Sequence, residues 1–96
     1  MTKDYYIYVM TNKKYGTLYV GVTNDLKRRN IEHKEGRGSQ FTRRYGLKRL
    51  DYFEHFTDPE YAIRREKQLK GGSRTQKTAL IDNYNPDWKD IFDQLS

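Results

Sequence analysis

The sequence predicts a small α/β sandwich in which helices flank a three-stranded antiparallel sheet, in the order ββαβααα. Two neighbouring segments rich in aromatic and β-branched residues are joined by a glycine-containing turn, which is the pattern of a β-hairpin. A third alternating segment follows, and stretches with helix start signals or helical periodicity lie before and after it. Because the chain has 96 residues, we expect residues 1–96 to form one domain.

The first two strands are expected at residues 5–10 and 17–23. Residues 5–10 place large side chains on both alternating faces, as in a strand that is buried on two sides. Residues 12–16 have the composition of a turn, with Asn, two Lys and a final Gly. These segments therefore predict an antiparallel hairpin at the start of the chain.

The register of this hairpin decides how two tyrosines are placed. If the turn centres on Lys13 and Lys14, Tyr8 lies opposite Tyr19 and both phenols project to the same face. For two tyrosines taken alone, cross-strand aromatic packing is the preferred interpretation. A catalytic role therefore needs support from other parts of the chain.

One helix is expected between the hairpin and the third strand. Thr23 or Asn24 can cap this helix, which runs through Glu35. A glycine-rich stretch at residues 36–39 ends it and begins a basic loop. Beyond the loop, residues 48–56 alternate as the third strand.

Three helices are expected after the third strand. Residues 58–59, Asp-Pro, are a strong helix start, and this helix runs to about Lys70. Ser73 can cap a second helix that runs to about Asn83. The last helix begins at residues 85–87. Its core-facing stripe, at i, i+3, i+4 and i+7, consists of Trp88, Ile91, Phe92 and Leu95.

The composition restricts the class of protein. The chain has no cysteine, which excludes a disulfide framework and a cysteine–zinc site. No apolar run approaches the length of a membrane span, and the first residues lack a signal-peptide pattern. We therefore expect a soluble, cytoplasmic protein that is a monomer and has no membrane partner.

Positive charge is concentrated in the middle of the chain. The formal net charge is +6, with nine of the 19 Lys and Arg residues in 27–49 and six in 64–77. This surplus suits a polyanionic partner, and a merely solvated surface is the alternative. The mixture of Arg with Phe and Tyr in residues 41–45 favours nucleic acid over a membrane. The residues expected to contact nucleic acid are Arg28, Lys34, Arg37, Arg43, Arg44 and Lys70.

Arg29 and His33 are candidate functional residues of the first expected helix. They lie one turn apart and therefore share a face. An arginine in this place can bind a phosphate and stabilise charge that develops in a transition state. Each residue also has an ordinary interpretation, Arg29 as a solvated arginine and His33 as a surface or capping histidine.

Glu66 is a second candidate, because it falls within an apolar helical stripe. That stripe is defined by Ala62, Ile63 and Leu69. A carboxylate there must find a cation, a hydrogen-bond network or open water. The spacing leaves two interpretations open, a salt bridge to Lys70 or Arg65 and a ligand for a divalent metal ion.

Taken together, these segments resemble the GIY-YIG nuclease superfamily. Tyr-Ile-Tyr at residues 6–8, ten residues and then Tyr-Val-Gly at residues 19–21 are similar to the two motifs that name it. Residues 22–29 resemble the segment that ends in the catalytic arginine, and residues 65–70 resemble the segment that holds the metal-binding glutamate. Residues 85–88 resemble the end of small stand-alone bacterial members. The resemblance extends over nearly the whole chain.

The resemblance implies the GIY-YIG fold and metal-assisted hydrolysis of a phosphodiester bond. Glu66 would hold one Mg²⁺ or Mn²⁺ ion. Tyr8 would accept a proton from the attacking water or position it, and Tyr19 and His33 would complete the network. Arg29 would neutralise the scissile phosphate.

The expected substrate is single-stranded or branched DNA, because little surface lies beyond the catalytic core and aromatic side chains can stack on exposed bases. RNA is an alternative substrate. The rival functions are a non-catalytic nucleic-acid-binding module and a nuclease subunit that cuts only with a protein partner in a DNA repair or recombination complex. The filled set of polar nuclease positions favours the enzyme, and Asn85 is a looser match that would support the metal region.

Overall fold

The computed structural model of the protein describes residues 3–95 and contains one antiparallel sheet. The sheet has the strand order β2-β1-β3, with β1 paired to both neighbours in antiparallel fashion. The sequence-predicted class, a three-stranded antiparallel sheet flanked by helices, is confirmed. The elements are β1 (Tyr5–Thr11), β2 (Leu18–Thr23), α1 (Leu26–Lys34), α2 (Gln40–Arg44), β3 (Arg49–Phe56), α3 (Pro59–Gly71), α4 (Arg74–Tyr84) and the 3-10 turn η1 (Phe92–Gln94).

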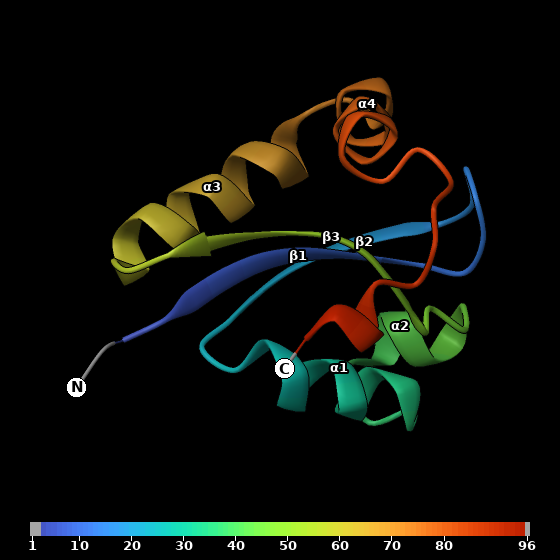
Figure 1. Ribbon diagram of the computed structural model, residues 1–96, viewed down its shortest axis with the longest axis horizontal. Helices are drawn as coiled ribbons and strands as arrows, with labels where there is room; N and C mark the ends of the chain where they lie inside the picture. Colours follow the sequence, from blue (N-terminus) through green and yellow to red (C-terminus); the bar gives the residue numbers. More distant parts are fainter. Residues whose placement is uncertain (1–2, 96) are drawn as a thin grey trace.

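The helices form a layer on each face of the sheet (Figure 1). Helices α3 and α4 lie on one side, and α1, α2 and the C-terminal segment lie on the other. The central strand β1 supplies both cores, because side chains of a strand alternate between its faces. Ile7 and Val9 pack toward α3 and α4, whereas Tyr8 and Met10 pack toward α1. The expectation of a first strand buried on two sides is confirmed.

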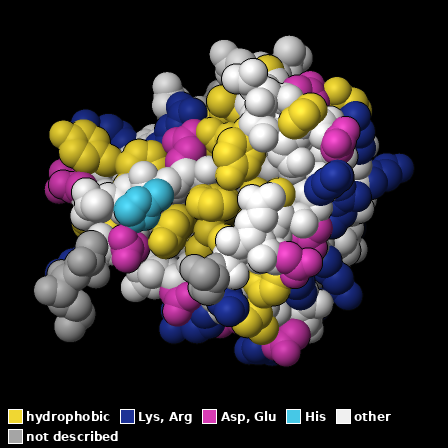
Figure 2. All heavy atoms as spheres, viewed as in Figure 1, with side chains coloured by type: hydrophobic (Ala, Val, Ile, Leu, Met, Phe, Trp, Pro, Cys, Tyr) yellow, Lys and Arg dark blue, Asp and Glu magenta, His cyan; other side chains and the backbone are white. Residues whose placement is uncertain are grey.

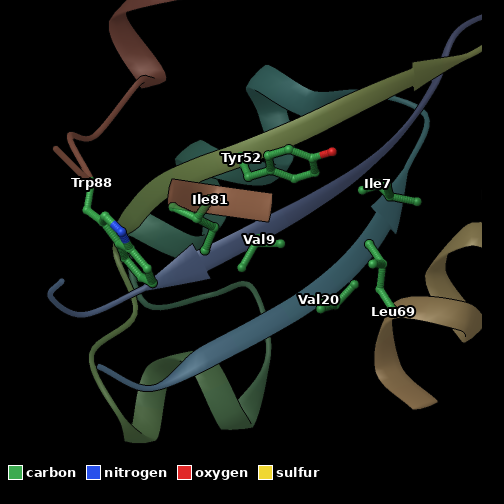
Figure 3. Packing of buried hydrophobic residues seen from close by; sticks show 7 residues of the cluster. All are labelled: Ile7, Val9, Val20, Tyr52, Leu69, Ile81 and Trp88. Atoms are coloured by element: carbon green, nitrogen blue, oxygen red, sulfur yellow. The ribbon is translucent and has the colours of Figure 1, made fainter. Parts of the chain in front are cut away.

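One core lies between the sheet and helices α3 and α4. Figure 3 shows Leu69 reaching from α3 toward β2 and Ile81 reaching from α4 toward β1. The second core contains Leu26 of α1 together with side chains from β1, β3 and the C-terminal segment. The first core consists of Ile7, Val9, Val20, Tyr52, Leu69, Ile81 and Trp88.

The helix boundaries follow local capping signals. Asp58 caps α3 by accepting a hydrogen bond from the Glu60 backbone N–H at 2.8 Å, and Pro59 is the first helical residue. Ser73 begins α4 with a reciprocal capping box. Helix α1 is capped by Asp25 rather than by the predicted Thr23 or Asn24.

The predicted last helix is reduced to the single turn η1. Of the four residues in the predicted stripe, Trp88 and Ile91 are buried, whereas Phe92 and Leu95 are only partly buried. However, Trp88 joins the core under α3 and α4, whereas Ile91 joins the core on the opposite face. One straight helix cannot present its stripe to both faces, so the segment wraps around the sheet, with Trp88 in the left-handed region at φ 53°.

Two further details differ from the sequence prediction. The basic loop contains an additional short helix, α2, which is capped by Ser39. Ile63, predicted to be part of the buried stripe of α3, is 44% exposed. Along residues 3–95, no helix combines the length and apolar character that crossing a membrane requires.

Apolar and basic side chains occupy different parts of the visible surface. On the face shown in Figure 2, hydrophobic side chains form a strip across the centre. Most Lys and Arg side chains in this view lie toward the right and lower margins of the molecule. The positive charge of the chain is therefore distributed unevenly over this face.

Candidate active site

The hairpin register places Tyr8 and Tyr19 on one face of the sheet, but not directly opposite each other. Tyr8 pairs with Gly21, and Tyr19 pairs with Met10, so the predicted pairing of the two tyrosines is wrong. The turn centres one residue later in the chain than expected. Because Tyr19 and Gly21 are two residues apart, Tyr19 still shares the face of Tyr8, and their ring centroids are 6.3 Å apart.

The corrected register gives Gly21 a specific role. The phenol of Tyr8 lies across this glycine, so that a Cβ atom at position 21 would be 2.5 Å from the Tyr8 Cζ and hydroxyl oxygen. Only a residue without a side chain leaves this space free. The glycine of the Tyr-Val-Gly segment is therefore the surface against which the Tyr8 ring is positioned.

His33 of α1 contacts the buried end of Tyr8. The Tyr8 hydroxyl is 2.8 Å from Nε2 of His33, and both side chains are almost completely buried. The other ring nitrogen, Nδ1, is 2.9 Å from Oγ1 of Thr42 on α2. Gly38 lies against the same ring, because a Cβ atom there would be 2.0 Å from Nδ1. The prediction that His33 faces this region agrees with its observed position.

Both partners of the Tyr8–His33 hydrogen bond are uncharged at neutral pH. Burial raises the pKa of Tyr8 to about 12, and the nearby Arg29 guanidinium opposes this rise only in part. Burial and the positive charge of Arg29 lower the pKa of His33 to about 4. The histidine is therefore a neutral imidazole that can accept a hydrogen bond from the phenol.

Arg29 is on the same helix as His33 and faces the same phenol. Its guanidinium is within electrostatic reach of Tyr8 and Tyr19. It also forms an ion pair with Glu32, with an N–O distance of 3.0 Å, and its side chain is 30% exposed. The charge of Arg29 is thus held at the site while part of the guanidinium stays open to a phosphate.

Glu66 approaches the site from α3. Its side chain is only 16% exposed, and its one ion pair is with Lys70, at 3.4 Å. The Glu66 carboxylate raises the pKa of Tyr8 slightly, which places it within electrostatic reach of the phenol. Arg65, the other cation considered for Glu66, binds Glu54 instead. A salt bridge to Lys70 is therefore present, and the Glu66 side chain is largely buried.

The donor set at Glu66 suits a hard divalent cation that keeps most of its water. Within residues 3–95, no three His, Cys, Asp or Glu side chains gather into a metal-binding group. Mg²⁺ is commonly held by one or two carboxylates together with water and substrate phosphate oxygens. A single, largely buried carboxylate that lies, like Arg29, within electrostatic reach of Tyr8 is compatible with this mode of binding.

An exposed row of aromatic rings continues outward from Tyr19. The Phe41 ring stacks on Tyr19 at 6.0 Å between centroids, and Tyr45 contacts Phe41 at 4.8 Å. Phe41 and Tyr45 are 42% and 44% exposed. We call Tyr19, Phe41 and Tyr45 the aromatic row.

Basic side chains border the aromatic row. Lys70 lies 5.8 Å from the centre of the Tyr19 ring, and the guanidinium of Arg44 lies 5.5 Å from the centre of the Tyr45 ring. Arg43 is exposed on α2. A hollow of about 290 Å³ at the edge of β2 is lined by Leu18, Tyr19, Val20, Phe41, Lys70 and Lys77.

The other expected nucleic-acid contacts occupy different environments. Arg28 is exposed at the start of α1, 4.0 Å from Asp25. Arg37 is paired with its neighbour Glu35. Lys34 binds Asp90 and the carbonyl oxygen of Lys48, and so connects α1 to the C-terminal segment.

The Asn85 side chain is committed to the backbone of the C-terminal segment. Its amide nitrogen donates to the carbonyl oxygens of Asp51, at 3.1 Å, and Lys89, at 2.8 Å. Its amide oxygen accepts from the Lys89 backbone N–H. Asn85 therefore fixes the turn that carries Trp88.

Sequence reasoning missed the groups that surround His33. Thr42 was not considered, although the spacing Ser39–Thr42 is a recognisable capping pattern for α2. Gly38 was interpreted only as part of a helix stop. The contacts of both residues with His33 depend on how the loop folds back onto α1, which local patterns do not specify.

The fold and the comparison with family models define the class of protein, a GIY-YIG domain. The family model of the GIY-YIG catalytic domain matches residues 4–79. The chain therefore belongs to the GIY-YIG family, whose members are generally endonucleases.

Within this family, the chain is similar to UPF0213 proteins. It is 36% identical over 81 residues to a UPF0213 protein of Natronomonas pharaonis, covering 84% of this chain and 94% of the relative. It is 32% identical over 88 residues to a UPF0213 protein of Lacticaseibacillus paracasei, covering 92% and 98%. The solution NMR structure of a UPF0213 protein from Bacillus halodurans is 32% identical, with a TM-score of 0.57 and 97% of each chain covered.

Proposed function

We propose that this protein is a divalent-metal-dependent endonuclease that hydrolyses phosphodiester bonds in DNA. The observation that carries the proposal is the buried hydrogen bond between Tyr8 and His33, with the Arg29 guanidinium beside it. A phenol, a neutral imidazole and an arginine at one point suit proton transfer next to a phosphate. Membership of a nuclease family supports the same conclusion.

Proton transfer begins at Tyr8. The attacking water oxygen forms a bond to phosphorus, and its proton passes to the Tyr8 oxygen while the phenol proton passes to Nε2 of His33. The phosphorus–oxygen bond to the leaving sugar breaks, and the leaving oxygen takes its proton from solvent. Because the proton moves on to His33, Tyr8 can act without being ionised beforehand, which its pKa of about 12 would otherwise prevent.

Arg29 and Glu66 supply the charges that the reaction needs. Arg29 neutralises negative charge that grows on the phosphate oxygens as the water attacks. Glu66 would hold the Mg²⁺ or Mn²⁺ ion, which when bound contributes Lewis-acid stabilisation of the phosphate. Tyr19 packs against both Tyr8 and His33 and keeps their rings in place.

Single-stranded or branched DNA is the substrate that the surface favours. The aromatic row offers exposed rings for unpaired bases, and Lys70 and Arg44 lie where they can follow the backbone. Paired bases would present only their edges and phosphates to these rings. We expect the protein to act in the cytoplasm as a monomer, with RNA as a second substrate to be compared.

The test is cleavage of a nucleic-acid panel by the purified protein. Single-stranded, duplex, flapped and branched DNA and matching RNA are incubated with Mg²⁺, Mn²⁺ or EDTA. We expect cleavage of the single-stranded or branched DNA that EDTA abolishes and that an Arg29→Ala preparation lacks. Binding without cleavage of any substrate by the wild type would instead indicate a non-catalytic module, and cleavage that appears only with an added repair complex would indicate a dependent subunit.

A further inference from the structure

We infer that Thr42 is a positioning residue that fixes the tautomer of His33, so that Nε2 is the nitrogen that accepts the proton of Tyr8. The inference rests on the proposed function for its catalytic consequence. Its structural content stands separately, because the protonated nitrogen of His33 can be measured without any nucleic acid. Which ring nitrogen of a neutral histidine carries the proton is set by the hydrogen bond that the other nitrogen makes.

A continuous hydrogen-bond chain runs from α2 to β1. The carbonyl oxygen of Ser39 is 3.2 Å from Oγ1 of Thr42, and that Oγ1 is 2.9 Å from Nδ1 of His33. On the other side of the ring, Nε2 is 2.8 Å from the Tyr8 hydroxyl. Thr42, His33 and Tyr8 are all almost completely buried, so water does not compete for these bonds.

The donor and acceptor roles in this hydrogen-bond chain are set at its α2 end, by Ser39 and Thr42. A carbonyl oxygen can only accept, so the contact with Ser39 uses the single proton of the Thr42 hydroxyl. The Ser39 hydroxyl, 2.9 Å from Thr42 Oγ1, can donate to it as well. Thr42 then offers only lone pairs to His33, and Nδ1 must be the nitrogen that carries the proton.

The β1 end of the hydrogen-bond chain is compatible with this direction. The guanidinium of Arg29, which is a donor only, faces the phenol of Tyr8. The phenol can therefore direct its proton toward Nε2 of His33, its hydrogen-bond partner, when Nε2 carries the lone pair. The tautomer itself is set at the α2 end, by Thr42.

The fold holds Thr42 in this place by two local features. Ser39 is the N-cap of α2, and its hydroxyl accepts a hydrogen bond from the Thr42 backbone N–H at 3.1 Å. Gly38 leaves room for the imidazole ring, because any side chain there would collide with Nδ1. The loop glycine and the N-cap of α2 thus hold Oγ1 of Thr42 next to Nδ1 of His33.

The experiment measures the ring-nitrogen shifts of ¹⁵N-labelled protein by NMR, without metal or DNA. His55 is exposed and bound to Asp4, so it is an internal reference. We expect wild type and Thr42→Ser to show His33 protonated at Nδ1 and unprotonated at Nε2, whereas Thr42→Val shifts protonation toward Nε2. A wild-type His33 protonated at Nε2, or an unchanged tautomer in a folded Thr42→Val protein, would overturn the inference.

Single-turnover cleavage provides the functional arm. We expect Thr42→Val to cut about 10–100-fold more slowly with unchanged DNA affinity, and Thr42→Ser to restore the rate, as for other groups that orient a functional histidine. Full activity of Thr42→Val with an altered tautomer would overturn the catalytic part. If Thr42→Val does not fold, the wild-type and Thr42→Ser spectra still decide the assignment. A protein without nuclease activity would refute the proposed function and leave the tautomer result standing.

Discussion

The Tyr8 hydroxyl lies 2.8 Å from Nε2 of His33, across 25 residues of sequence and between a strand and a helix. The contact joins the Tyr-Ile-Tyr segment to α1 inside the protein rather than at its surface. Because both groups are buried and neutral, the bond is protected from solvent yet can transmit a proton. It is therefore the first target for mutation.

Tyr8→Phe keeps the ring but removes this hydrogen bond. We expect cleavage to fall by about 10²–10⁴-fold, the usual contribution of a general acid or base. The free energy of unfolding should fall by about 1–3 kcal/mol, because Nε2 of His33 loses its partner. Tyr61→Phe, at an exposed site on α3, is the control. Cleavage at the wild-type rate by Tyr8→Phe would remove the phenol from the mechanism.

Gly21→Ala tests the surface on which Tyr8 rests. The added Cβ would lie 2.5 Å from the Tyr8 hydroxyl, so the phenol must move. We expect a loss of about 1–3 kcal/mol in unfolding free energy, as in other overpacked sites, together with slower cleavage. Gly71→Ala is a matched control, because no heavy atom lies within 4 Å of its added Cβ. Denaturant titration of both variants checks this, and equal stabilities would contradict the packing argument.

Much of the fold could be predicted because its signals are local. The alternation in β1 and the caps at Asp58 and Ser73 each act within a few residues, and each matches the structure. The C-terminal segment could not be predicted in the same way. Trp88 and Ile91 have helical spacing but bury themselves in opposite cores, and that division is a property of the assembled sheet.

The candidate site was predictable to a similar extent. Tyr8 and Tyr19 share a face whenever the strand partner of Tyr8 is Tyr19 or a residue an even number of positions from it. This prediction is therefore correct although the predicted register was wrong. The Thr42–His33 contact depends instead on the path of the basic loop between α1 and α2. No periodicity describes such a path, and its hydrogen bonds become visible only in three dimensions.

Asp51 should make the stability depend on pH in an unusual direction. Burial, followed by repulsion from Asp90, raises its pKa from 3.8 to about 6, although Thr11, Arg49 and Lys34 oppose this rise. Since the folded pKa lies above the unfolded one, the stabilising contribution is complete below pH about 4 and is lost as the pH rises through 6. The loss should be on the order of 3 kcal/mol.

The measurement compares the wild type with Asp51→Asn between pH 4 and pH 7. Carboxylates that do not interact with Asp51 affect both proteins alike and cancel in the difference. We expect the wild type to lose stability relative to Asp51→Asn as the pH rises across this range. A difference that stays constant with pH would show that Asp51 does not titrate there.

Arg43 and Arg44 of α2 should contribute to DNA binding through phosphates. Replacing both by Ala should weaken binding to single strands and reduce the slope of log K against log salt by about 1.4, if each contacts one phosphate. Arg64→Ala with Lys89→Ala removes the same charge from exposed positions elsewhere. Binding titrations at several salt concentrations check this. An equal change of slope in both double variants would indicate a general charge effect instead of a contact.

The Glu66→Gln variant distinguishes between two hypotheses, a metal-dependent enzyme and a non-catalytic binding module. The substitution keeps the size of the side chain but removes the charge that would attract a divalent ion. If Glu66 is the metal ligand, several kcal/mol of transition-state stabilisation are lost, and cleavage should fall by at least about 10²-fold. The ion pair with the half-exposed Lys70 also disappears, but this should lower stability by roughly 1 kcal/mol or less.

Single-turnover cleavage and a DNA-binding titration distinguish these contributions. Glu66→Gln should bind DNA as the wild type does and fail to cut it, whereas Glu60→Gln, at the exposed start of the same helix, should do both. Arg29→Ala should also lose cleavage, by about 3 kcal/mol, because the charge on the phosphate loses its partner. If Glu66 only pairs with Lys70, the Glu66→Gln protein will keep its activity with slightly lower stability, and the metal assignment must be abandoned.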